Sequence, residues 1–181
     1  MRSAVLACHP ATPCRPVGRF AVGVRQRPGW LVLEYRIEGD IGALSIPPPG
    51  LPQRADGLWR STCLELFIKG LGEAYYEFNF APSGAWAAYR FTAYRQGMAV
   101  LEGIEPVDIA THRDAHRFEL AAAVNLGTLQ MPYEGSGLRL GLSSVLQDRQ
   151  GDVSYWAIAH AQGRPDFHHP DSFAFFPTIS A

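Results

Sequence analysis

The sequence predicts an all-β fold, a jelly-roll-like sandwich of two antiparallel sheets with about ten strands. Apolar and polar residues alternate over many short stretches, as they do in half-buried strands. The 181 residues include 18 glycines and 14 prolines, which suits a chain that turns often. No stretch has the periodicity of a long helix, so we expect at most one short helical turn. The length suits a single domain over residues 1–181.

The composition narrows the classes of partner. A net charge of −1 without any basic run argues against a nucleic-acid surface. The three cysteines form no Cys-x-x-Cys pair, so we expect neither a disulfide framework nor a metal site. The apolar stretch before Cys8 is too short for a signal peptide, and no stretch is long enough to span a membrane. We therefore expect a cytoplasmic protein that does not bind membranes; the sequence does not indicate an oligomeric state.

In the N-terminal part, strands are expected at residues 3–8, 19–26 and 30–38. The last of these alternates most clearly, and its apolar face carries Leu31, Leu33, Tyr35 and Ile37. Residues 39–57 contain three consecutive prolines, which forbid a central strand and predict an ordered loop.

The C-terminal part continues the pattern of short strands. We expect a hairpin from residues 107–113 and 116–124, a helical turn over 125–130 capped by Asn125, and strands at 138–147, 153–159 and 173–176.

The stretch from Trp59 to Arg95 predicts three antiparallel strands with one apolar face and one mixed face. A five-residue loop at 70–74 would bring Glu65 opposite Asn79. If residues 81–84 form the next turn, Phe80 lies opposite Ala85. That register places three pairs on the mixed face: Asn79 with Trp86, Glu77 with Ala88, and Tyr75 with Arg90.

The mixed face has the composition of a saccharide site. It gathers Glu65, Phe67, Tyr75, Glu77, Asn79, Trp86 and Arg90, with Trp59 at its edge. Sugar C–H groups stack on aromatic rings, and sugar hydroxyls pair with carboxylate, amide and guanidinium groups. The alternative is a second core layer, in which Glu77 and Arg90 form an ion pair under a loop.

A second candidate stretch runs from Ser154 to Asp171 and joins a strand to a loop rich in His and Asp. If its strand adjoins the mixed face, Trp156 forms a second aromatic wall across from Trp59. His160, His168 and Asp171 are the further candidates here. The alternative is a packed loop in which aspartates cap turns and histidines bind the backbone.

Three segments together resemble a known family: LWRSTCLELFI, YYEFNFAPSGAWAAYRF and SYWAIAHAQGRPDFHHPDSF. From about His9 to the C-terminus the chain resembles the DOMON-like domains of uncharacterised bacterial proteins, which are similar to carbohydrate-binding module family 9. The resemblance implies a jelly-roll-like sandwich with a non-catalytic binding role, in which relatives bind sugars or haem. It also implies that Trp59 and Trp156 match the two tryptophans that sandwich a sugar, with Glu65 as the carboxylate of the strand that Trp59 leads.

The expected function is therefore non-catalytic binding of a small ligand, most plainly a saccharide. No cofactor is expected, because the histidines and methionines do not match the axial motif of the haem-binding relatives. Two alternatives stay open: a domain that binds haem or another cofactor, and a glycoside-active enzyme that uses Glu65 and Glu77.

Overall fold

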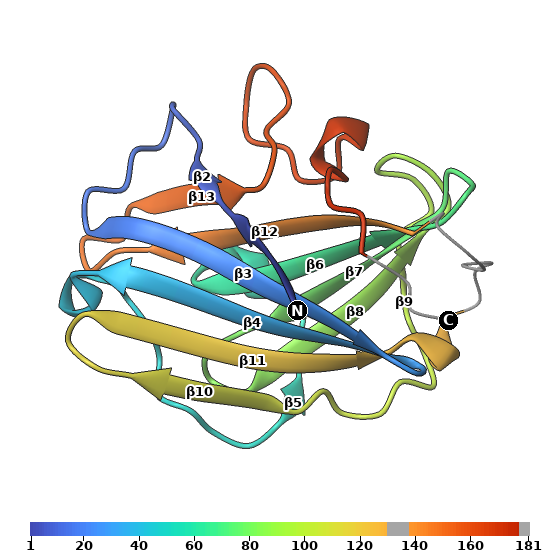
Figure 1. Ribbon diagram of the computed structural model, residues 1–181, viewed down its shortest axis with the longest axis horizontal. Helices are drawn as coiled ribbons and strands as arrows, with labels where there is room; N and C mark the ends of the chain where they lie inside the picture. The colour runs from blue at the N-terminus through green and yellow to red at the C-terminus, as the bar shows by residue number, and fades with distance from the viewer. Residues whose placement is uncertain (130–137, 178–181) are drawn as a thin grey trace.

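The computed structural model describes residues 1–129 and 138–177, which form two β-sheets packed face to face (Figure 1). The smaller sheet consists of β1 (Arg2–Val5), β3 (Val17–Arg27), β4 (Trp30–Gly39), β10 (Ile109–Arg113) and β11 (Arg117–Asn125). The larger sheet consists of β2 (Ala7–Cys8), β5 (Gln53–Arg54), β6 (Cys63–Lys69), β7 (Tyr75–Phe80), β8 (Ala85–Phe91), β9 (Ala99–Val100), β12 (Arg139–Gln147) and β13 (Val153–Ala157). Four 3₁₀ turns complete the described elements: η1 (Ile41–Ala43), η2 (Leu58–Arg60), η3 (Leu126–Thr128) and η4 (Pro170–Ser172).

The strand order confirms the predicted two-sheet sandwich. The smaller sheet runs β1-β3-β4-β11-β10, and the larger runs β2-β13-β12-β6-β7-β8-β5 with β9 beside β8. All pairs are antiparallel except the short parallel pair of β5 with β8. No helix in residues 1–129 or 138–177 is long and apolar enough to cross a lipid bilayer.

Several predicted elements differ in detail. The expected strand at 3–8 is divided at the buried Leu6, so β1 joins the smaller sheet and β2 the larger one. The loop predicted at 39–57 contains η1 and β5. The expected strand at 173–176 is reduced to one bridge between Phe175 and Leu140. Asn125 caps η3 as predicted, while residue 130 lies outside the described part of the chain.

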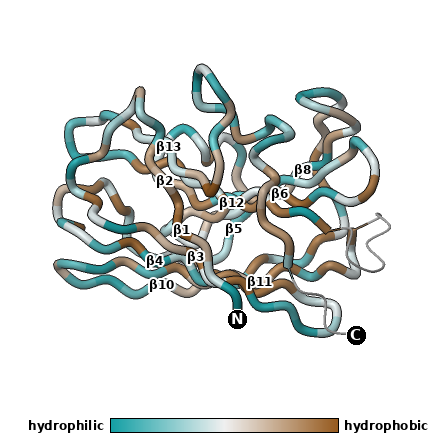
Figure 2. The backbone as a smooth tube through the Cα atoms, turned by 45° about the horizontal axis from the view of Figure 1, so that its top comes forward, coloured by the Kyte–Doolittle hydropathy of each residue, from teal (hydrophilic) through white to brown (hydrophobic). Residues whose placement is uncertain are grey.

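The main core lies between the sheets, where the predicted apolar faces meet. The alternating residues of β4, Leu31 to Ile37, are buried there, as are Leu64, Leu66 and Ile68 of β6. In Figure 2 the strands carry most of the hydrophobic residues, while the connecting loops are mainly hydrophilic. One polar contact crosses this core: the buried Tyr35 hydroxyl donates to the main-chain carbonyl of Glu65 at 2.8 Å. The smaller sheet thereby holds the middle of β6 in position.

The register of β7 with β8 is shifted by one residue from the prediction, whereas that of β6 with β7 is as predicted. Glu65 lies opposite Asn79 across the loop at 70–74. Beyond β7, however, Phe80 pairs with Trp86 and not with Ala85. Gly84 adopts a left-handed conformation (φ 87°) and the amide of Ala81 donates to the carbonyl of Ala85. A type I turn followed by such a glycine adds one residue to the hairpin.

This shift overturns the predicted positions of Trp86 and Arg90. Both now lie on the opposite face of β8 from the mixed face, since side chains alternate along a strand. Trp86 is buried in the main core, and Arg90 is exposed near the sheet edge, opposite Ala99 of β9. The mixed face of β8 instead presents Ala87, Tyr89 and Phe91.

The predicted position of Trp156 on the mixed face is also wrong. It lies opposite Ser144 of β12, whose apolar neighbours Leu142 and Leu146 face the main core. Its indole is therefore buried between the sheets, 5.7 Å from the Phe20 ring, and its Nε1 donates to Ser154. Trp156 cannot form a second wall across from Trp59, and the neighbouring Tyr155 has the outward position.

The crossing hydrogen bond of Tyr35 makes a measurable prediction. Tyr35→Phe leaves the buried carbonyl of Glu65 without this donor and should lower the free energy of unfolding by about 1 kcal/mol. Tyr76→Phe is the matched control, because its hydroxyl has no hydrogen-bond partner in the described residues and its loss should cost under about 0.5 kcal/mol. Urea unfolding of both variants measures the difference, and equal stabilities would contradict the role of the crossing bond.

Candidate functional site

The outer face of the larger sheet carries a second hydrophobic cluster, which we call the outer cluster. Its buried members are Phe67, Tyr75, Ala87, Tyr89, Phe91, Val145, Ala157, Phe167 and Phe173, and Trp59 and Tyr155 pack against it. Residues from the segments after β8 and after β13, among them Arg95, Phe167 and Phe173, cover this face. The alternative of a second core layer is thus correct for most of the aromatic residues.

A cavity of about 350 Å³ remains within the outer cluster, at the lower end of the ~300–1,000 Å³ of ligand pockets. Its lining combines aromatic, acidic, basic and sulfur-containing side chains: Trp59, Glu65, Glu77, Phe91, Arg95, Met98, Val145, Tyr155, Pro165, Phe167 and His168. The segments that contribute these residues are far apart in the sequence and meet only in the folded chain.

A larger hollow of about 600 Å³ lies on the outer face of the smaller sheet. Its lining mixes small residues such as Ala21 and Gly23 with charged ones, among them Arg36 and Glu119, which pair with each other at 2.7 Å. The tyrosine in this lining, Tyr35, is 1% exposed and belongs to the main core, so it offers a ligand no ring to stack on. We therefore take the cavity on the larger sheet as the candidate site.

The floor of the cavity is formed by Glu65 and Glu77, from the neighbouring strands β6 and β7. They are only 2% and 4% exposed. Ser143, opposite Glu65 on β12, donates to its Oε2 at 3.3 Å. Asn79 lies beneath the cavity; its Nδ2 donates to Oε1 of Glu77 at 2.7 Å, and its Oδ1 accepts from the Cys63 thiol.

Burial disfavours the ionised form of both floor carboxyl groups. It raises the pKa of Glu77 to about 7, against the opposing effects of the Asn79 hydrogen bond and the Arg95 charge. Burial also raises the pKa of Glu65 well above its usual range, and the charge of Glu77 adds to this. Two neighbouring buried carboxyl groups keep a proton to higher pH than exposed ones do.

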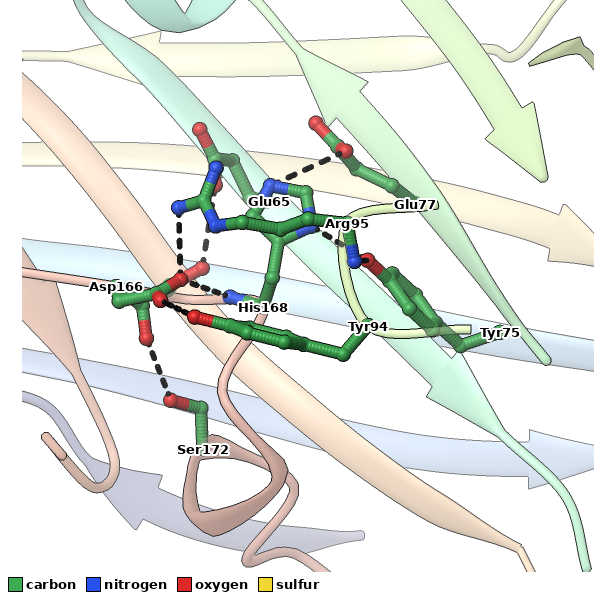
Figure 3. A network of polar contacts seen from close by, with 9 residues as sticks. Glu65, Tyr75, Glu77, Tyr94, Arg95, Asp166, His168 and Ser172 are labelled. Carbon is green, nitrogen blue, oxygen red and sulfur yellow. Dashed lines mark hydrogen bonds and ion pairs between the residues drawn. The ribbon is translucent and has the colours of Figure 1, made fainter. Parts of the chain in front are cut away.

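Asp166 links the segment after β8 to the segment after β13 by hydrogen bonds (Figure 3). Its Oδ1 accepts from Arg95 at 2.8 Å and from the main chain of His168 at 3.0 Å, while Tyr94 donates to Oδ2 at 2.5 Å. Arg95 itself has a left-handed backbone (φ 54°), uncommon for a residue with a side chain. The main-chain amide of Arg95 donates to the Tyr75 hydroxyl at 3.2 Å.

His168 closes the cavity next to the floor. Its Nδ1 is 2.8 Å from the Tyr75 hydroxyl, whose oxygen already accepts from the Arg95 amide, so we assign Tyr75 as the donor to Nδ1. The proton of the neutral ring is then on Nε2, which lies 3.9 Å from Oε2 of Glu77 (Figure 3). Burial and, secondarily, the Arg95 charge lower the pKa of His168 to about 4. The imidazole is therefore uncharged at neutral pH.

Of the ten residues predicted for the site, four line the cavity: Trp59, Glu65, Glu77 and His168. Asn79 supports the floor from beneath. His160 does not line the cavity, because its Nε2 bonds to the carbonyl of Ala7 at 2.8 Å. Asp171 points to solvent from η4 and has a 73% exposed side chain. His160 thus binds the backbone, as in the packed-loop alternative, whereas in η4 the cap is His169, whose Nδ1 accepts from the amide of Asp171.

Sequence reasoning did not predict the other lining residues, which are Phe91, Arg95, Met98, Val145, Tyr155, Pro165 and Phe167. Tyr155 follows from the alternation of β13 once Trp156 is known to face inward. Phe167 lies beside His168 in the stretch already singled out. Arg95 and Met98 belong to the loop after β8. This loop is held by a hydrogen bond from Arg95 to Asp166, 71 positions later in the chain, and the local sequence gives no signal for such a contact.

The pKa shifts predict how stability depends on pH. A carboxyl group with a raised pKa in the folded state binds its proton more tightly there than in the unfolded chain. The free energy of unfolding therefore decreases as pH rises from about 4.5 through 7. His168, with its lowered pKa, acts in the opposite sense only between about 4 and 6.5. Above pH 6.5 the titration of His168 therefore no longer changes the free energy of unfolding, whereas that of the floor carboxyl groups still does.

Glu77→Gln keeps the shape and an acceptor for Asn79 but removes this titration. Its free energy of unfolding, relative to the unmodified protein, should rise by about 2–3 kcal/mol between pH 4.5 and 8. Urea unfolding at several pH values measures this difference. Parallel pH curves for the two proteins would show that Glu77 titrates normally.

Neither a protein-family model nor a curated protein sequence matches the chain. Among solved structures, the crystal structure of a proposed carbohydrate-binding protein from Bacteroides uniformis is similar, with a TM-score of 0.65 and 15% sequence identity. The similarity covers 97% of this chain and 84% of that one. The chain therefore shares the fold of that structure, while the narrower resemblance to DOMON-like domains and carbohydrate-binding module family 9 remains a prediction.

Proposed function

We propose that the cavity on the larger sheet binds a saccharide without catalysing its turnover. The observation that carries this proposal is the meeting of Trp59 and other aromatic rings with two carboxyl groups in one cavity of about 350 Å³. Sugar rings have apolar C–H faces that stack on aromatic rings, and hydroxyl edges that need hydrogen-bonding partners.

The stacking ring and the carboxyl groups come from different elements, η2 for Trp59 and the strands β6 and β7 for Glu65 and Glu77. Trp59 is half-buried on η2 and packs edge-on against Tyr89, with ring centres 5.8 Å apart. That contact holds the indole in place without covering it completely. The floor carboxyl groups and the Nε2 of His168 supply acceptors and a donor for hydroxyl groups. The neighbour from Bacteroides uniformis, described as a proposed carbohydrate binder, supports this class of ligand but no particular sugar.

Haem is an alternative because Met98 and His168 line the same cavity. The surrounding residues fit it poorly. An axial histidine needs a free ring nitrogen, but Nδ1 is bonded to Tyr75 and Nε2 faces Glu77. Two buried carboxyl groups at the floor also favour a polar ligand over a large apolar macrocycle.

A glycoside-cleaving enzyme that uses Glu65 and Glu77 is the other alternative. Retaining glycosidases need one carboxylate ionised as the nucleophile and a second carboxyl group as the acid. Glu65 is only 2% exposed and burial raises its pKa, which suits a hydrogen-bonding group better than an ionised nucleophile. We therefore assign both residues to binding.

The saccharide proposal predicts a specific loss on removal of one ring. Trp59→Ala should weaken saccharide affinity by about 10-fold or more, ~1.4 kcal/mol, because the stacking surface is lost. Trp30→Ala is the matched control, since Trp30 is 40% exposed and does not line the cavity. Glycan-array screening followed by calorimetry on any sugar found measures both effects. Unchanged affinity in Trp59→Ala would remove this cavity as the site.

A further inference from the structure

The floor of the cavity carries acidic groups without a cationic partner. Within the described residues, Glu65 receives one donor, Ser143 on Oε2, and no side-chain or main-chain donor reaches its Oε1. Glu77 receives Asn79 on Oε1, while its Oε2 is 3.9 Å from His168, beyond hydrogen-bond distance. Each carboxyl group thus keeps one oxygen for which the described chain supplies no hydrogen bond.

The nearest cations do not balance these groups. Arg95 lines the cavity, but its guanidinium pairs with Asp166 at 2.8 Å. Asp166 is held in that pair by further bonds from Tyr94 and the His168 amide. His168 is neutral for the reasons given above. The charge of Arg95 lowers the pKa of Glu77, but within the described residues no ion pair joins Arg95 to either floor carboxyl group.

Burying acidic groups without a counter-charge costs free energy, and buried charges in proteins are normally paired. A neutral sugar hydroxyl would need only one such acceptor, and an amide would serve it equally well. The cavity also presents the rings of Trp59, Phe91, Tyr155 and Phe167, and the faces of aromatic rings attract cations. Acidic floor and aromatic walls together are suited to an ammonium group.

We propose that the saccharide bound here is an amino sugar, whose protonated amine lies between Glu65 and Glu77. This inference rests on the proposed saccharide-binding function and specifies its ligand class. An ammonium group has three N–H donors, enough to meet the unused oxygen of each floor carboxyl group. Such charge-assisted hydrogen bonds are about twice as strong as neutral ones. The rest of the sugar ring then stacks on Trp59.

The test compares matched ligands on the unmodified protein. Calorimetry at pH 7 would use glucosamine, N-acetylglucosamine and glucose, and the same three forms of galactose and mannose. The free amine should bind about 10-fold or more tighter than its acetylated and neutral counterparts, because charged hydrogen bonds contribute about 1.5–3 kcal/mol each. This comparison needs no variant, so it does not depend on how a mutant folds.

Variants then locate the preference. Glu65→Gln and Glu77→Gln keep side-chain shape and remove the charge, so each should reduce the preference for the amine by about 10-fold. Glu73→Gln is the matched control, since Glu73 is exposed in the loop between β6 and β7 and does not line the cavity. Thermal unfolding of each variant checks that it is folded.

The outcomes separate the two proposals. Equal affinity for all three forms, with dependence on Trp59, would overturn the amino-sugar inference and leave saccharide binding standing. An amine preference that survives in both glutamine variants would also overturn it, because other groups would then carry the preference. Absence of binding to every sugar would overturn both.

Discussion

The larger sheet is buried on both faces, and the character of the site depends on this constraint. One face packs on the smaller sheet, and the other is covered by the segments after β8 and β13. An antiparallel sheet commonly leaves its second face to water, where acidic residues are hydrated. Here Glu65 and Glu77 are enclosed, so they can meet only one another, their neighbours on the sheet and whatever enters the cavity. Burial accordingly sets their protonation and their ability to recognise a ligand.

The covering segments are held by a small number of polar contacts. Asp166 joins Arg95 and Tyr94 to the loop that carries His168, and Tyr75 joins both segments to the sheet. Asp166, which accepts from the main chain of His168, also pairs with the guanidinium of Arg95. These bonds thus fix the shape of the cavity and keep the guanidinium of Arg95 in a pair with Asp166 instead of a direct pair with a floor carboxyl group.

Local patterns were sufficient to predict much of the fold. The alternation of β4, the pairing of Glu65 with Asn79 and the Asn125 cap all depend on residues close in sequence. The pairing of β7 with β8 was wrong because one left-handed glycine, Gly84, changes the count of turn residues. A shift of one residue moves every side chain to the other face, which is why Trp86 and Arg90 were both misplaced.

The candidate site was predicted less completely, since it depends on contacts between distant segments. Glu65 and Glu77 follow from the phase of β6 and β7, and both line the cavity. The inward phase of Trp156 is set by its pairing with Ser144 of β12, which alternation within β13 alone does not reveal. Arg95 enters the site only because Asp166, far along the chain, draws its loop across the sheet.

The central claim is that ligand enters the cavity on the outer face of the larger sheet. The chain contains four tryptophans, and the fold places them in distinct surroundings: Trp59 at the cavity, Trp86 and Trp156 in the main core, and Trp30 exposed elsewhere. The most direct measurement follows their four indole N–H resonances by NMR while the tightest-binding hexose is added. We predict a saturable shift of Trp59 with the other three nearly unchanged. A stationary Trp59 resonance, or a dominant shift of Trp30, would contradict the claim.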